Sequence, residues 1–328
     1  MTAFKLGFLT HVHGPGKDST TVLRELLDVF AAADELGFDG GWVAQHHFRD
    51  DFGRLPSPLV FFGAAAARAP RLRLGTAVTV LPLEDPLRLA EDAAVLDAFS
   101  GGALELGLGT GGANHEAFSA FGHDPGRRRE LFDDRLTVLK AALRGDPLPG
   151  GDLVLQPPVP ALADRIWQST SDNARAAQIG AHGDGLLLGT AVHDPETVQK
   201  PLAEAYLTTA VRPRFGIVRA VFPAKDRQAA QDDLAPALAI HRTGFVGHGL
   251  TELVDLPVDD YLARINVHHG TPAEVVASLR ADPALLGYLN PDSWFLPVVQ
   301  HELSDPGADV ERLRVIAEEI APALGWRR

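Results

Sequence analysis

The sequence predicts a (β/α)8 barrel, and three observations support this prediction. Short apolar runs alternate with amphipathic helical patterns along nearly the whole chain, which is typical of β/α units. Eight such strand–helix repeats can be assigned. Histidines, hydroxyl residues and glycines follow several of the strands, as in barrels whose active site lies at the carboxyl ends of the strands. We therefore expect a single barrel domain over residues 1–328.

The expected strands are short apolar segments, each flanked by a helical pattern. They are Phe4–Thr10, Gly41–Ala44, Leu72–Val80, Ala103–Gly109, Arg165–Gln168, Asp184–Leu188, Arg214–Val221 and Ser293–Val299. Helix boundaries fit between them. Asp18 or Ser19 can cap the first helix and Gly37 ends it, while Asp85 followed by Pro86 begins the helix after the third strand. The last helix is expected over Asp309–Ala321, closed by Pro322.

Two insertions interrupt the regular alternation. Gly145–Leu162, after the fourth helix, is rich in proline and glycine and is expected to form a loop or small hairpin. The segment from about residue 225 to 292, between strands seven and eight, is longer than a crossover needs and could carry extra helices over the mouth. Within it, Thr271-Pro272 predicts a helix start. His268 and His269 are interpreted as turn residues without a functional role.

Composition excludes several classes of function. The net charge is −13, from 30 basic and 43 acidic residues, which argues against a nucleic-acid partner. The chain has no cysteine, so disulfides, thiolate catalysis and cysteine-ligated metal centres are excluded. The sequence starting at Met1 does not have the pattern of a signal sequence, and no apolar run is long enough to span a membrane. We expect a cytoplasmic protein that does not bind membranes.

Two other folds or functions compete for parts of the sequence. Gly107–Gly112 fits the G-x-G-x-x-G pattern of dinucleotide-binding folds, but it ends the fourth strand and not the first, and no acidic residue follows on a next strand. His11 and His13 follow the first strand as H-x-H, a spacing that metal-dependent hydrolases of the amidohydrolase kind use to hold a metal. The predicted eighth strand ends Pro297-Val-Val-Gln-His301 without the Asp that such a site needs.

The adjacent histidines after the second strand are the strongest candidates for chemistry. Imidazole can take up or release a proton near neutral pH without a large shift of its pKa. Because neighbouring side chains on a strand point to opposite sides, only one of His46 and His47 is expected to face into the barrel mouth.

A block of motifs in the first half of the chain resembles the bacterial luciferase-like flavin monooxygenases. The motifs are Trp42-Val-Ala-Gln-His-His-Phe48, Leu72–Pro82, Asp85-Pro86 and Gly107-Leu-Gly-Thr-Gly-Gly112. The resemblance extends over nearly the whole chain and is weakest across 225–292. It implies a (β/α)8 barrel that uses reduced FMN and O2 to oxygenate a small organic substrate.

The resemblance also implies roles for particular residues. The first histidine of the pair, His46, lies near the flavin and takes part in proton transfer, with His47 and His11 as further candidates. The strand end packs beneath the isoalloxazine ring, often through a cis peptide bond, and the glycine loop leaves room for the ring. The FMN phosphate binds at the helix start after the fifth strand. The implied cofactor-binding residues are Ala77, Val78, Thr79, Gly109, Thr110, Gly111, Ser169, Thr170 and Ser171.

The chain departs from the pattern of this family at two positions. Gln45 stands where the family often has Glu, and Thr110 stands where many members carry an Arg that reaches the phosphate. One of the three arginines at 127–129 could substitute for that Arg, although a solvated basic surface is the simpler interpretation. NAD(P)H is expected to reduce the flavin directly or through a partner reductase, and a homodimer is expected. Deazaflavin-dependent hydride transfer on the same fold is the nearest alternative, and no bound metal is expected.

Overall fold

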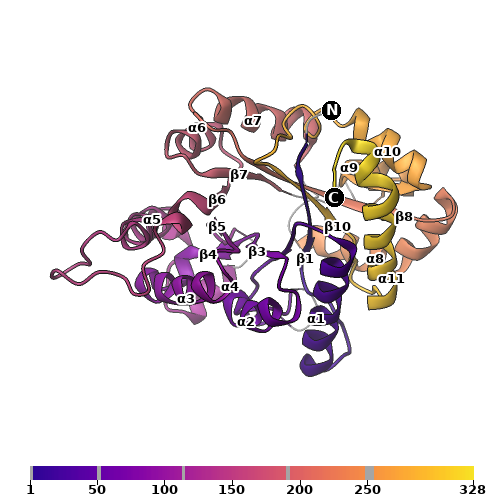
Figure 1. The fold of residues 1–328 in the computed structure, drawn as a ribbon. Coiled ribbons are helices and arrows are strands. Elements are labelled where there is room, and N and C mark those ends of the chain that lie inside the picture. The colour runs from indigo at the N-terminus through magenta and orange to yellow at the C-terminus, as the bar shows by residue number, and fades with distance from the viewer. Residues whose placement is uncertain (1–2, 50–52, 113–114, 190–192, 248–254) are drawn as a thin grey trace.

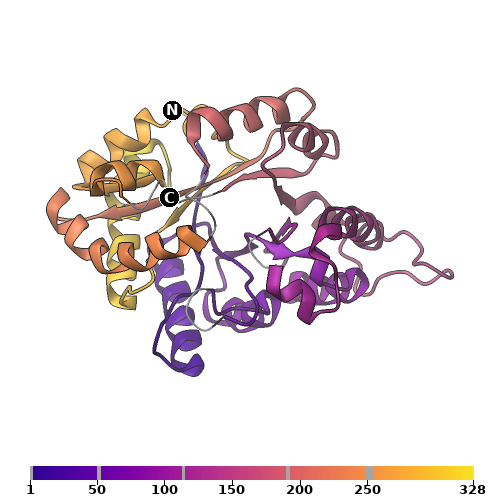
Figure 2. The same ribbon diagram turned by 180° about the vertical axis from the view of Figure 1, so that it is seen from behind.

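Parallel strands form a closed barrel in the computed structural model, which describes residues 3–49, 53–112, 115–189, 193–247 and 255–328 (Figures 1 and 2). The strands follow the order β10-β1-β2-β3-β5-β6-β7-β8, and β10 pairs with β8 to close the ring. The predicted (β/α)8 barrel is confirmed. The strands are β1 (Lys5–Thr10), β2 (Gly40–Val43), β3 (Arg73–Thr76), β4 (Thr79–Val80), β5 (Leu104–Gly109), β6 (Ile166–Ser169), β7 (Gly185–Leu188), β8 (Phe215–Pro223), β9 (Val267–Gly270) and β10 (Trp294–Val298).

Helices surround this barrel and connect its strands (Figures 1 and 2). None of the helices in the described part of the chain combines the length and apolar character needed to cross a membrane. Helices α1 to α6 are α1 (Ser19–Leu36), α2 (Pro58–Arg68), α3 (Pro86–Phe99), α4 (His115–Ala120), α5 (Arg128–Arg144) and α6 (Asn173–Ala181). The remaining helices are α7 (Lys200–Leu207), α8 (Arg227–Gly247), α9 (Val258–Arg264), α10 (Pro272–Ala281), α11 (Pro306–Val315) and α12 (Ala321–Leu324).

The predicted helix boundaries in the first half of the chain are confirmed. The Asp18 carboxylate accepts a hydrogen bond from the Thr21 N–H, and Gly37 ends α1 with a φ of 83°, a conformation that favours glycine. Asp85 caps α3 by accepting from the N–H groups of Leu87 and Arg88. These caps satisfy backbone groups that the helix itself leaves without partners.

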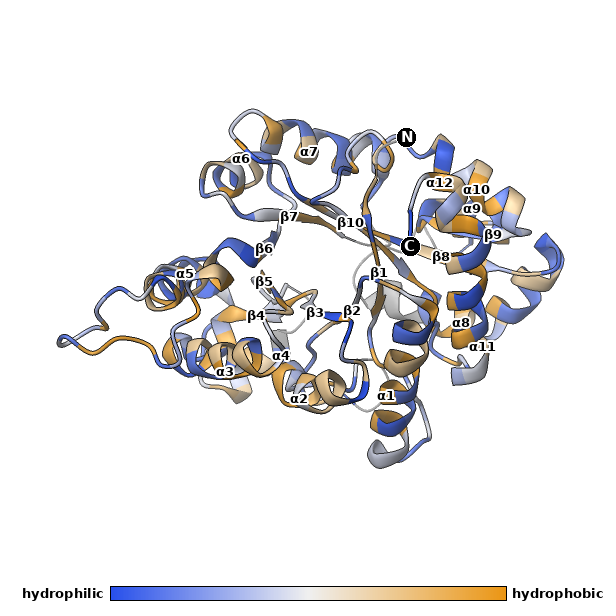
Figure 3. Cartoon of the chain, viewed as in Figure 1, coloured by the Kyte–Doolittle hydropathy of each residue, from blue (hydrophilic) through white to orange (hydrophobic). Residues whose placement is uncertain are grey.

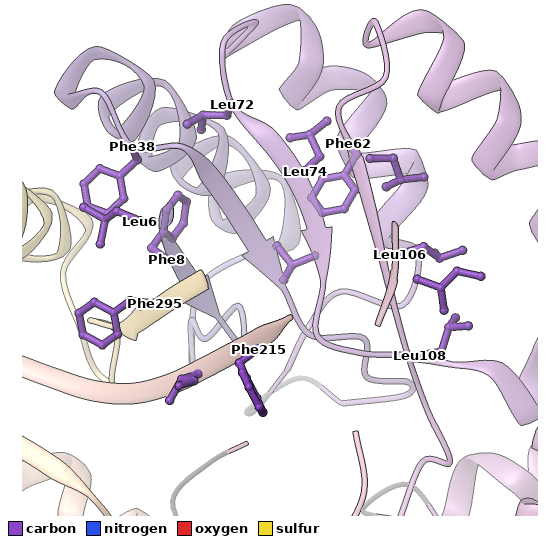
Figure 4. Close-up of a cluster of buried hydrophobic side chains, with 14 of the residues drawn as sticks. Leu6, Phe8, Phe38, Phe62, Leu72, Leu74, Leu106, Leu108, Phe215 and Phe295 are labelled. Atoms are coloured by element: carbon purple, nitrogen blue, oxygen red, sulfur yellow. The ribbon is translucent and has the colours of Figure 1, made fainter. Parts of the chain in front are cut away.

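The main core lies between the strands and the helices. Figure 4 shows side chains such as Phe8, Phe62, Leu74 and Leu106 packed in this layer. On β5 the alternating residues Leu104, Leu106 and Leu108 belong to the layer, which leaves the residues between them to face the barrel interior. Each fully buried side chain of this kind contributes about 1.5–3 kcal/mol of hydrophobic stabilisation.

Three tryptophans fill much of the barrel interior. Trp42 makes edge contacts with Trp167 and Trp294, at ring-centroid distances of 5.8 Å and 5.5 Å. The Trp167 indole N–H donates to the buried Glu105 carboxylate, which also pairs with Arg73 at 2.7 Å. The aliphatic side chains of Leu9, Leu187, Val218 and Leu296 belong to the same cluster. The interior is therefore a packed apolar base for whatever binds at the mouth above it.

The predicted continuous strand Leu72–Val80 is wrong in one respect, because it is interrupted. β3 ends at Thr76 and β4 begins at Thr79, and the peptide bond between Ala77 and Val78 is cis. At the break the Thr76 hydroxyl takes the place of backbone hydrogen bonds between β3 and β5. It donates to the Gly107 carbonyl and accepts from the Gly107 N–H. β4 then resumes the pairing with β5.

The insertion at 225–292 contains α8, α9 and α10 and also one strand. β9 pairs in parallel with the carboxyl half of β8, with Val221 opposite His268. The interpretation of His268 and His269 as turn residues is therefore wrong: both are buried on β9, and the His268 Nδ1 lies 2.8 Å from the Ser278 hydroxyl. The predicted helix start is confirmed, because Thr271 and Glu274 form a capping box.

The end of the last helix also differs from the prediction. Pro322 does not close it, because α11 continues through a π-helical turn, Ile316–Ile320, into α12, which ends at Gly325. A proline in the first turn of a helix needs no N–H partner, so the π turn lets the chain continue past this residue.

Candidate active site

The loops after β1 and β2 bring His11 and His46 together at the carboxyl end of the barrel. Their ring centroids are 5.9 Å apart, and the His13 ring lies at the same distance from the His11 ring. Gly53 packs directly against the His46 ring, because a Cβ atom at this glycine would overlap the imidazole. Gly53 therefore restricts the orientation of His46.

His47 has different surroundings from its neighbour. Its ring lies 5.1 Å from the Phe121 ring, and Phe48 and Phe121 are themselves in contact. His47 is buried, its Nε2 has no hydrogen-bond partner among the described residues, and burial lowers its pKa. The two adjacent histidines thus meet different parts of the mouth.

The imidazoles of His11 and His13 are neutral near pH 7. Burial, with smaller contributions from His46 and His241, lowers the pKa of His11 to about 3. Burial also lowers the pKa of His13 well below its usual value, with His11 as the next cause. Neutral imidazoles act as hydrogen-bond donors and acceptors and not as cations.

An apolar surface with few side chains lies beside these histidines. Ala77 and Val78 are partly buried against the interior tryptophan cluster. The ideal Cβ position of Gly109 would overlap a Val78 methyl group and would lie 3.2 Å from the Ser169 hydroxyl. These residues, Ala77, Val78 and Gly109 with Ser169 at the edge, are called the platform below. The structure therefore brings predicted cofactor-binding residues from β3, β5 and β6 together.

The other predicted residues of these loops adjoin the platform. Thr79 is buried, and its hydroxyl has no hydrogen-bond partner within the described ranges. Thr110 is partly buried, and Gly111 has a φ of 72° in a position where a Cβ atom would overlap Val80. Glycine at 111 is thus required by both backbone conformation and packing.

Gln45 holds the backbone next to the cis peptide bond. Its amide nitrogen donates to the Pro56 carbonyl at 2.9 Å and to Glu84 at 2.7 Å, and its amide oxygen accepts from the Val80 N–H at 2.6 Å. An ionised Glu could not donate to the first two acceptors. The departure from the family pattern at this position therefore has a structural explanation: Gln45 fixes β4 and contributes no acid to the mouth.

The start of α6 lies next to the platform through Ser169. The Thr170 hydroxyl accepts from the Asp172 N–H at 3.1 Å, and the Asp172 carboxylate caps α6 by accepting from the Arg175 N–H at 3.0 Å. Ser171 is exposed. The hydroxyls of Ser169 and Ser171 and the first N–H groups of α6 can bind an anion, and Asp172 places a negative charge at the same helix end.

The three arginines at 127–129 make local contacts or are exposed. Arg127 forms an ion pair with Glu130 at 2.6 Å, Arg128 donates to the Pro125 carbonyl, and Arg129 is exposed. The interpretation of this run as a solvated basic surface agrees with these contacts.

Sequence reasoning missed three polar residues on the opposite side of the mouth. His241 on α8 lies with its Nδ1 3.0 Å from the Tyr261 hydroxyl of α9, and its Nε2 is 3.9 Å from the Glu302 carboxylate. Burial lowers the pKa of His241 to about 4, raises that of Tyr261 to about 12, and raises that of Glu302. Their sequence separation and their position outside the barrel strands gave no signal of this proximity.

A small cavity lies behind His13, between α1 and α11. It offers water about 30 Å3 of space, and its polar lining includes Thr10, Gln300 and Asp309. Burial raises the pKa of Asp309 to about 6, although Arg312 pairs with it at 2.9 Å. Within the described residues, no group of three or more histidine, aspartate or glutamate side chains could hold a metal ion. The H-x-H at 11–13 thus has no third ligand there.

Similar sequences include several monooxygenases. An uncharacterized protein of Sinorhizobium fredii is 31% identical over 199 residues, which cover 58% of this chain and 56% of that protein. The 4-hydroxyprotoasukamycin monooxygenase of Streptomyces nodosus subsp. asukaensis is 34% identical over 139 residues, covering 42% of this chain and 37% of that protein. The matched segments thus span little more than half of these relatives or less.

Similar solved structures cover nearly the whole chain. Monooxygenase RslO1 from Streptomyces bottropensis has a TM-score of 0.82 at 25% identity, over 97% of this chain and 99% of that one. The oxygenating constituent of 3,6-diketocamphane monooxygenase from Pseudomonas putida, in complex with FMN, has a TM-score of 0.75 at 17% identity, over 98% of each chain. The latter likeness shows the fold alone.

The family model described as luciferase-like monooxygenase matches residues 4–287, which include β1, β2, the platform and the start of α6. The histidine pair, the interrupted third strand and the glycine-rich end of β5 all lie inside the matched range. On this match, the chain belongs to the luciferase-like monooxygenase family.

Proposed function

We propose that the chain is an FMN-dependent monooxygenase that uses reduced flavin and O2 to oxygenate a small organic substrate. The observation that carries the proposal is the meeting of two kinds of surface at one barrel mouth. The platform at Ala77, Val78 and Gly109 is apolar and nearly free of side chains. The neutral imidazole of His11 is in ring contact with His46, and the chain segment of His46 adjoins the platform, since the Gln45 N–H donates to the Val78 carbonyl at 3.3 Å. A flat ring needs the first surface, and proton transfer needs the second.

The residues present fit FMN at this place. Gly109 has no side chain to obstruct a ring above Val78, and the Thr79 hydroxyl is a buried polar atom without a partner in the described part of the chain. Ser169 connects the platform to the start of α6, where hydroxyls and N–H groups would hold the phosphate. Reduced FMN supplies two electrons to O2, so that one oxygen atom enters the substrate and the other leaves as water.

The protein's part is to bind, to exclude water and to move protons. The platform residues Ala77 and Val78 pack on the tryptophan cluster, which gives a ring above them an apolar support. His46 would carry the proton that oxygen reduction requires, and His11, neutral at pH 7, would form a hydrogen bond on the substrate side. His47, against Phe121, would close the edge of the mouth.

Deazaflavin-dependent hydride transfer is the second candidate on the same fold. The coenzyme F420-dependent tetrahydromethanopterin reductase from Methanopyrus kandleri has a TM-score of 0.68 at 14% identity, over 98% of this chain. FMN is favoured because the relatives with informative names and higher identity, including an alkanal monooxygenase alpha chain at 34% over 132 residues, are monooxygenases.

We also infer that the chain forms a homodimer through α2 and α3. These helices carry large exposed apolar side chains, Val60, Val95 and Phe99, with exposed fractions of 79%, 58% and 65%. Figure 3 shows that much of the ribbon of both helices has a hydrophobic colour. Exposed apolar surface of this kind is typical of protein interfaces. Sedimentation velocity should detect a dimer in the wild type and a monomer in a Val60→Glu/Phe99→Glu variant; a monomeric wild type would contradict the inference.

Cofactor titration tests the proposed function. The protein should bind FMN more tightly than riboflavin, and the reduced FMN complex should consume O2 with oxygenation of a suitable substrate. Measuring NAD(P)H oxidation with and without an added flavin reductase would identify the source of electrons. Tight binding of a deazaflavin together with failure to bind FMN would favour hydride transfer, and equal affinity for FMN and riboflavin would remove the phosphate site.

A further inference from the structure

The segment from Thr10 to Gly14, called the histidine segment below, has an unusual backbone conformation at its centre. Val12 has a φ of 61°, in the left-handed region that a β-branched residue adopts only where its surroundings hold it. The dihedral angles of Val12 set the directions in which His11 and His13 leave the chain. Whatever holds Val12 in this conformation therefore also sets the orientation of both rings.

Gln300, in the loop after β10, binds the chain on both sides of Val12. Its amide oxygen accepts a hydrogen bond from the Thr10 hydroxyl at 2.6 Å and another from the His13 N–H at 3.1 Å. The Thr10 hydroxyl oxygen in turn accepts from the Val12 N–H at 3.1 Å. One side chain from the last strand end thus holds the residues that precede and follow Val12.

A buried carboxylate determines which way the Gln300 amide points. The Gln300 Nε2 donates to the Asp309 carboxylate at 3.4 Å, and Asp309 forms an ion pair with the Arg312 guanidinium at 2.9 Å. Because a carboxylate accepts hydrogen bonds, the amide nitrogen faces Asp309 and the amide oxygen is left for the two donors of the histidine segment. Asp309 and Arg312 are both buried, so they form a fixed support for Gln300.

Arg54, between β2 and α2, also holds the histidine segment. Its backbone N–H donates to the Val12 carbonyl at 3.1 Å, and its guanidinium donates to the Gly14 carbonyl at 2.6 Å. His46 precedes Arg54 in the same connection between β2 and α2. The carbonyl of Val12 is thus bound to the connection that carries His46, and the two imidazole rings of His11 and His46 meet at 5.9 Å.

We propose that Gln300 is a positioning residue of the active site, which holds His11 against His46 by fixing Val12 in the left-handed conformation. Gln300 acts through the backbone of the histidine segment. The proposal rests on the proposed function for the use that is made of His11, but the geometry that it describes requires no flavin. Without Gln300, Val12 should relax to a negative φ and the His11 ring should turn away from His46.

Gln300→Leu removes both accepted hydrogen bonds and keeps a side chain of similar size. The His11 ring should then become hydrated, and because burial is the largest cause of its low pKa of about 3, the pKa should rise to about 5 or above. NMR titration of the folded protein with isotope-labelled histidine measures this pKa, and His11→Gln identifies the signal. The other titratable groups that act on His11 and His13 are His46, His241 and His301, which the substitution leaves in place.

Turnover gives a second measurement. Reduced-flavin oxidation should be about ten- to a hundredfold slower in Gln300→Leu, because a small displacement of a reacting group has an effect of this size. FMN affinity should stay within about twofold, because the platform and the start of α6 keep their contacts. A loss of rate without a loss of affinity is expected from a displaced side chain and not from general damage to the barrel.

Two variants test whether Gln300 acts through Val12. Glycine adopts a positive φ without strain, so Gln300→Leu should change the His11 pKa much less in a Val12→Gly protein than in the wild type. Gln300→Glu keeps an acceptor oxygen for both donors and should restore the wild-type pKa of His11. At pH 6 the new carboxyl group can share a proton with Asp309, whose pKa is about 6.

Gln199→Leu is the matched control. Gln199 is also a buried glutamine, and it accepts from Arg219 and donates to the His193 carbonyl, outside the histidine segment. This variant should lower the stability of the fold and leave the pKa of His11 unchanged. If Gln300→Leu does not fold, Thr10→Val supplies the test, because it removes the hydroxyl between Gln300 and the Val12 N–H at nearly constant shape.

The outcomes separate this proposal from the proposed function. A folded Gln300→Leu protein, or in its place Thr10→Val, that keeps the wild-type pKa of His11 would overturn the positioning role. An equal shift in Gln199→Leu would overturn it as well. A protein in which the His11 pKa shifts as expected, but which oxidises no reduced flavin even as the wild type, would keep the geometry described above and overturn the proposed function alone.

Discussion

The two halves of the barrel mouth are built in different ways. In the first half, the functional candidates stand directly at strand ends: His11 follows β1, His46 follows β2, and Gly109 and Ser169 end β5 and β6. In the second half, His241 and Tyr261 lie on helices of the insertion, and Glu302 lies in the loop after β10. The first half presents an apolar platform with histidines, and the second presents a group of polar side chains.

This difference indicates a division of labour between the barrel and its insertion. Strand ends are fixed by hydrogen bonds on both sides, so they can hold a rigid ring at constant geometry. An insertion can change in sequence without disturbing the barrel, which makes it the suitable place for substrate contacts. We therefore expect variants at the strand ends to affect the cofactor and the chemistry, and variants in the insertion to affect substrate recognition.

The largest expected effect belongs to His46 in the first half. His46→Ala should lower turnover by about 10²–10⁴-fold, the usual contribution of a general acid–base group. Flavin affinity should change by about tenfold or less, because ring contacts are distributed over the platform and the phosphate site. Stopped-flow measurement of reduced-flavin oxidation gives the rate, and a separate flavin titration gives the affinity.

His47→Ala is the matched control for this experiment, because its ring lies against Phe121 and not against His11. If His47→Ala loses turnover and His46→Ala does not, the roles assigned to the two histidines are reversed. If neither variant changes the rate, the pair is structural and the mouth needs another proton carrier.

The next largest effect tests the platform itself. Gly109→Ala should weaken FMN binding by about tenfold or more, since a methyl group there would displace Val78 from the ring surface. Gly112→Ala is the control, because among the described residues no atom outside its immediate chain neighbours lies within 4 Å of its Cβ position. Fluorescence titration measures the FMN affinity of both variants. Equal affinities in the two would show that the ring does not lie on Gly109.

The same division explains how much could be predicted from the sequence. A parallel barrel makes neighbours of the residues that follow successive strands, so His46, Val78, Gly109 and Ser169 could be placed together once the strands were assigned. The cis bond at 77–78 could be anticipated from the family resemblance, while the contacts of Gln45 could not, because they depend on the exact position of Pro56 and Glu84.

The second half resisted prediction for a physical reason. His241, Tyr261 and Glu302 are far apart in the sequence, and neither a strand end nor a helical period relates them. β9 was missed because Asn266–Pro272 contains residues common in turns, whereas pairing with an extended β8 stabilises this segment as a strand. Tertiary contacts, and not local propensity, determine this region.

The loss of folding stability at acid pH involves residues of both halves, and the expected effect is moderate. His11 and His241 have a pKa of 6.5 when unfolded and about 3 and about 4 when folded. Between pH 6.5 and pH 4 only the unfolded chain takes up these protons, so stability falls as the pH falls, by about 1 kcal/mol per pH unit for each of the two groups after solvent screening. Thermal unfolding midpoints at pH 7 and pH 5 measure this loss.

A His11→Gln/His241→Gln variant should lose less stability between the two pH values than the wild type. Asp309 changes the stability in the opposite direction, because its raised pKa of about 6 favours proton uptake by the folded state. Stability from this group is gained as the pH falls through 6, so Asp309→Asn should steepen the acid dependence. An unchanged slope in the double histidine variant would show that these imidazoles do not govern the acid response.

The smallest expected effect concerns the end of the first half, at the helix start that would hold the FMN phosphate. Asp172 caps α6, and its negative charge lies beside the proposed anion site. Asp172→Asn keeps the cap, since Asn and Asp are equally good at this position, but removes the charge. FMN affinity should then rise by about two- to fivefold, and the gain should shrink in 1 M salt, where the screening length is about 3 Å.

Riboflavin lacks the phosphate, so its affinity should stay constant in the same variant. An equal rise for both flavins would mean that Asp172 acts on the ring or on the fold. No change for either would place the phosphate away from α6 and leave the platform as the remaining support for a flavin in this half of the mouth.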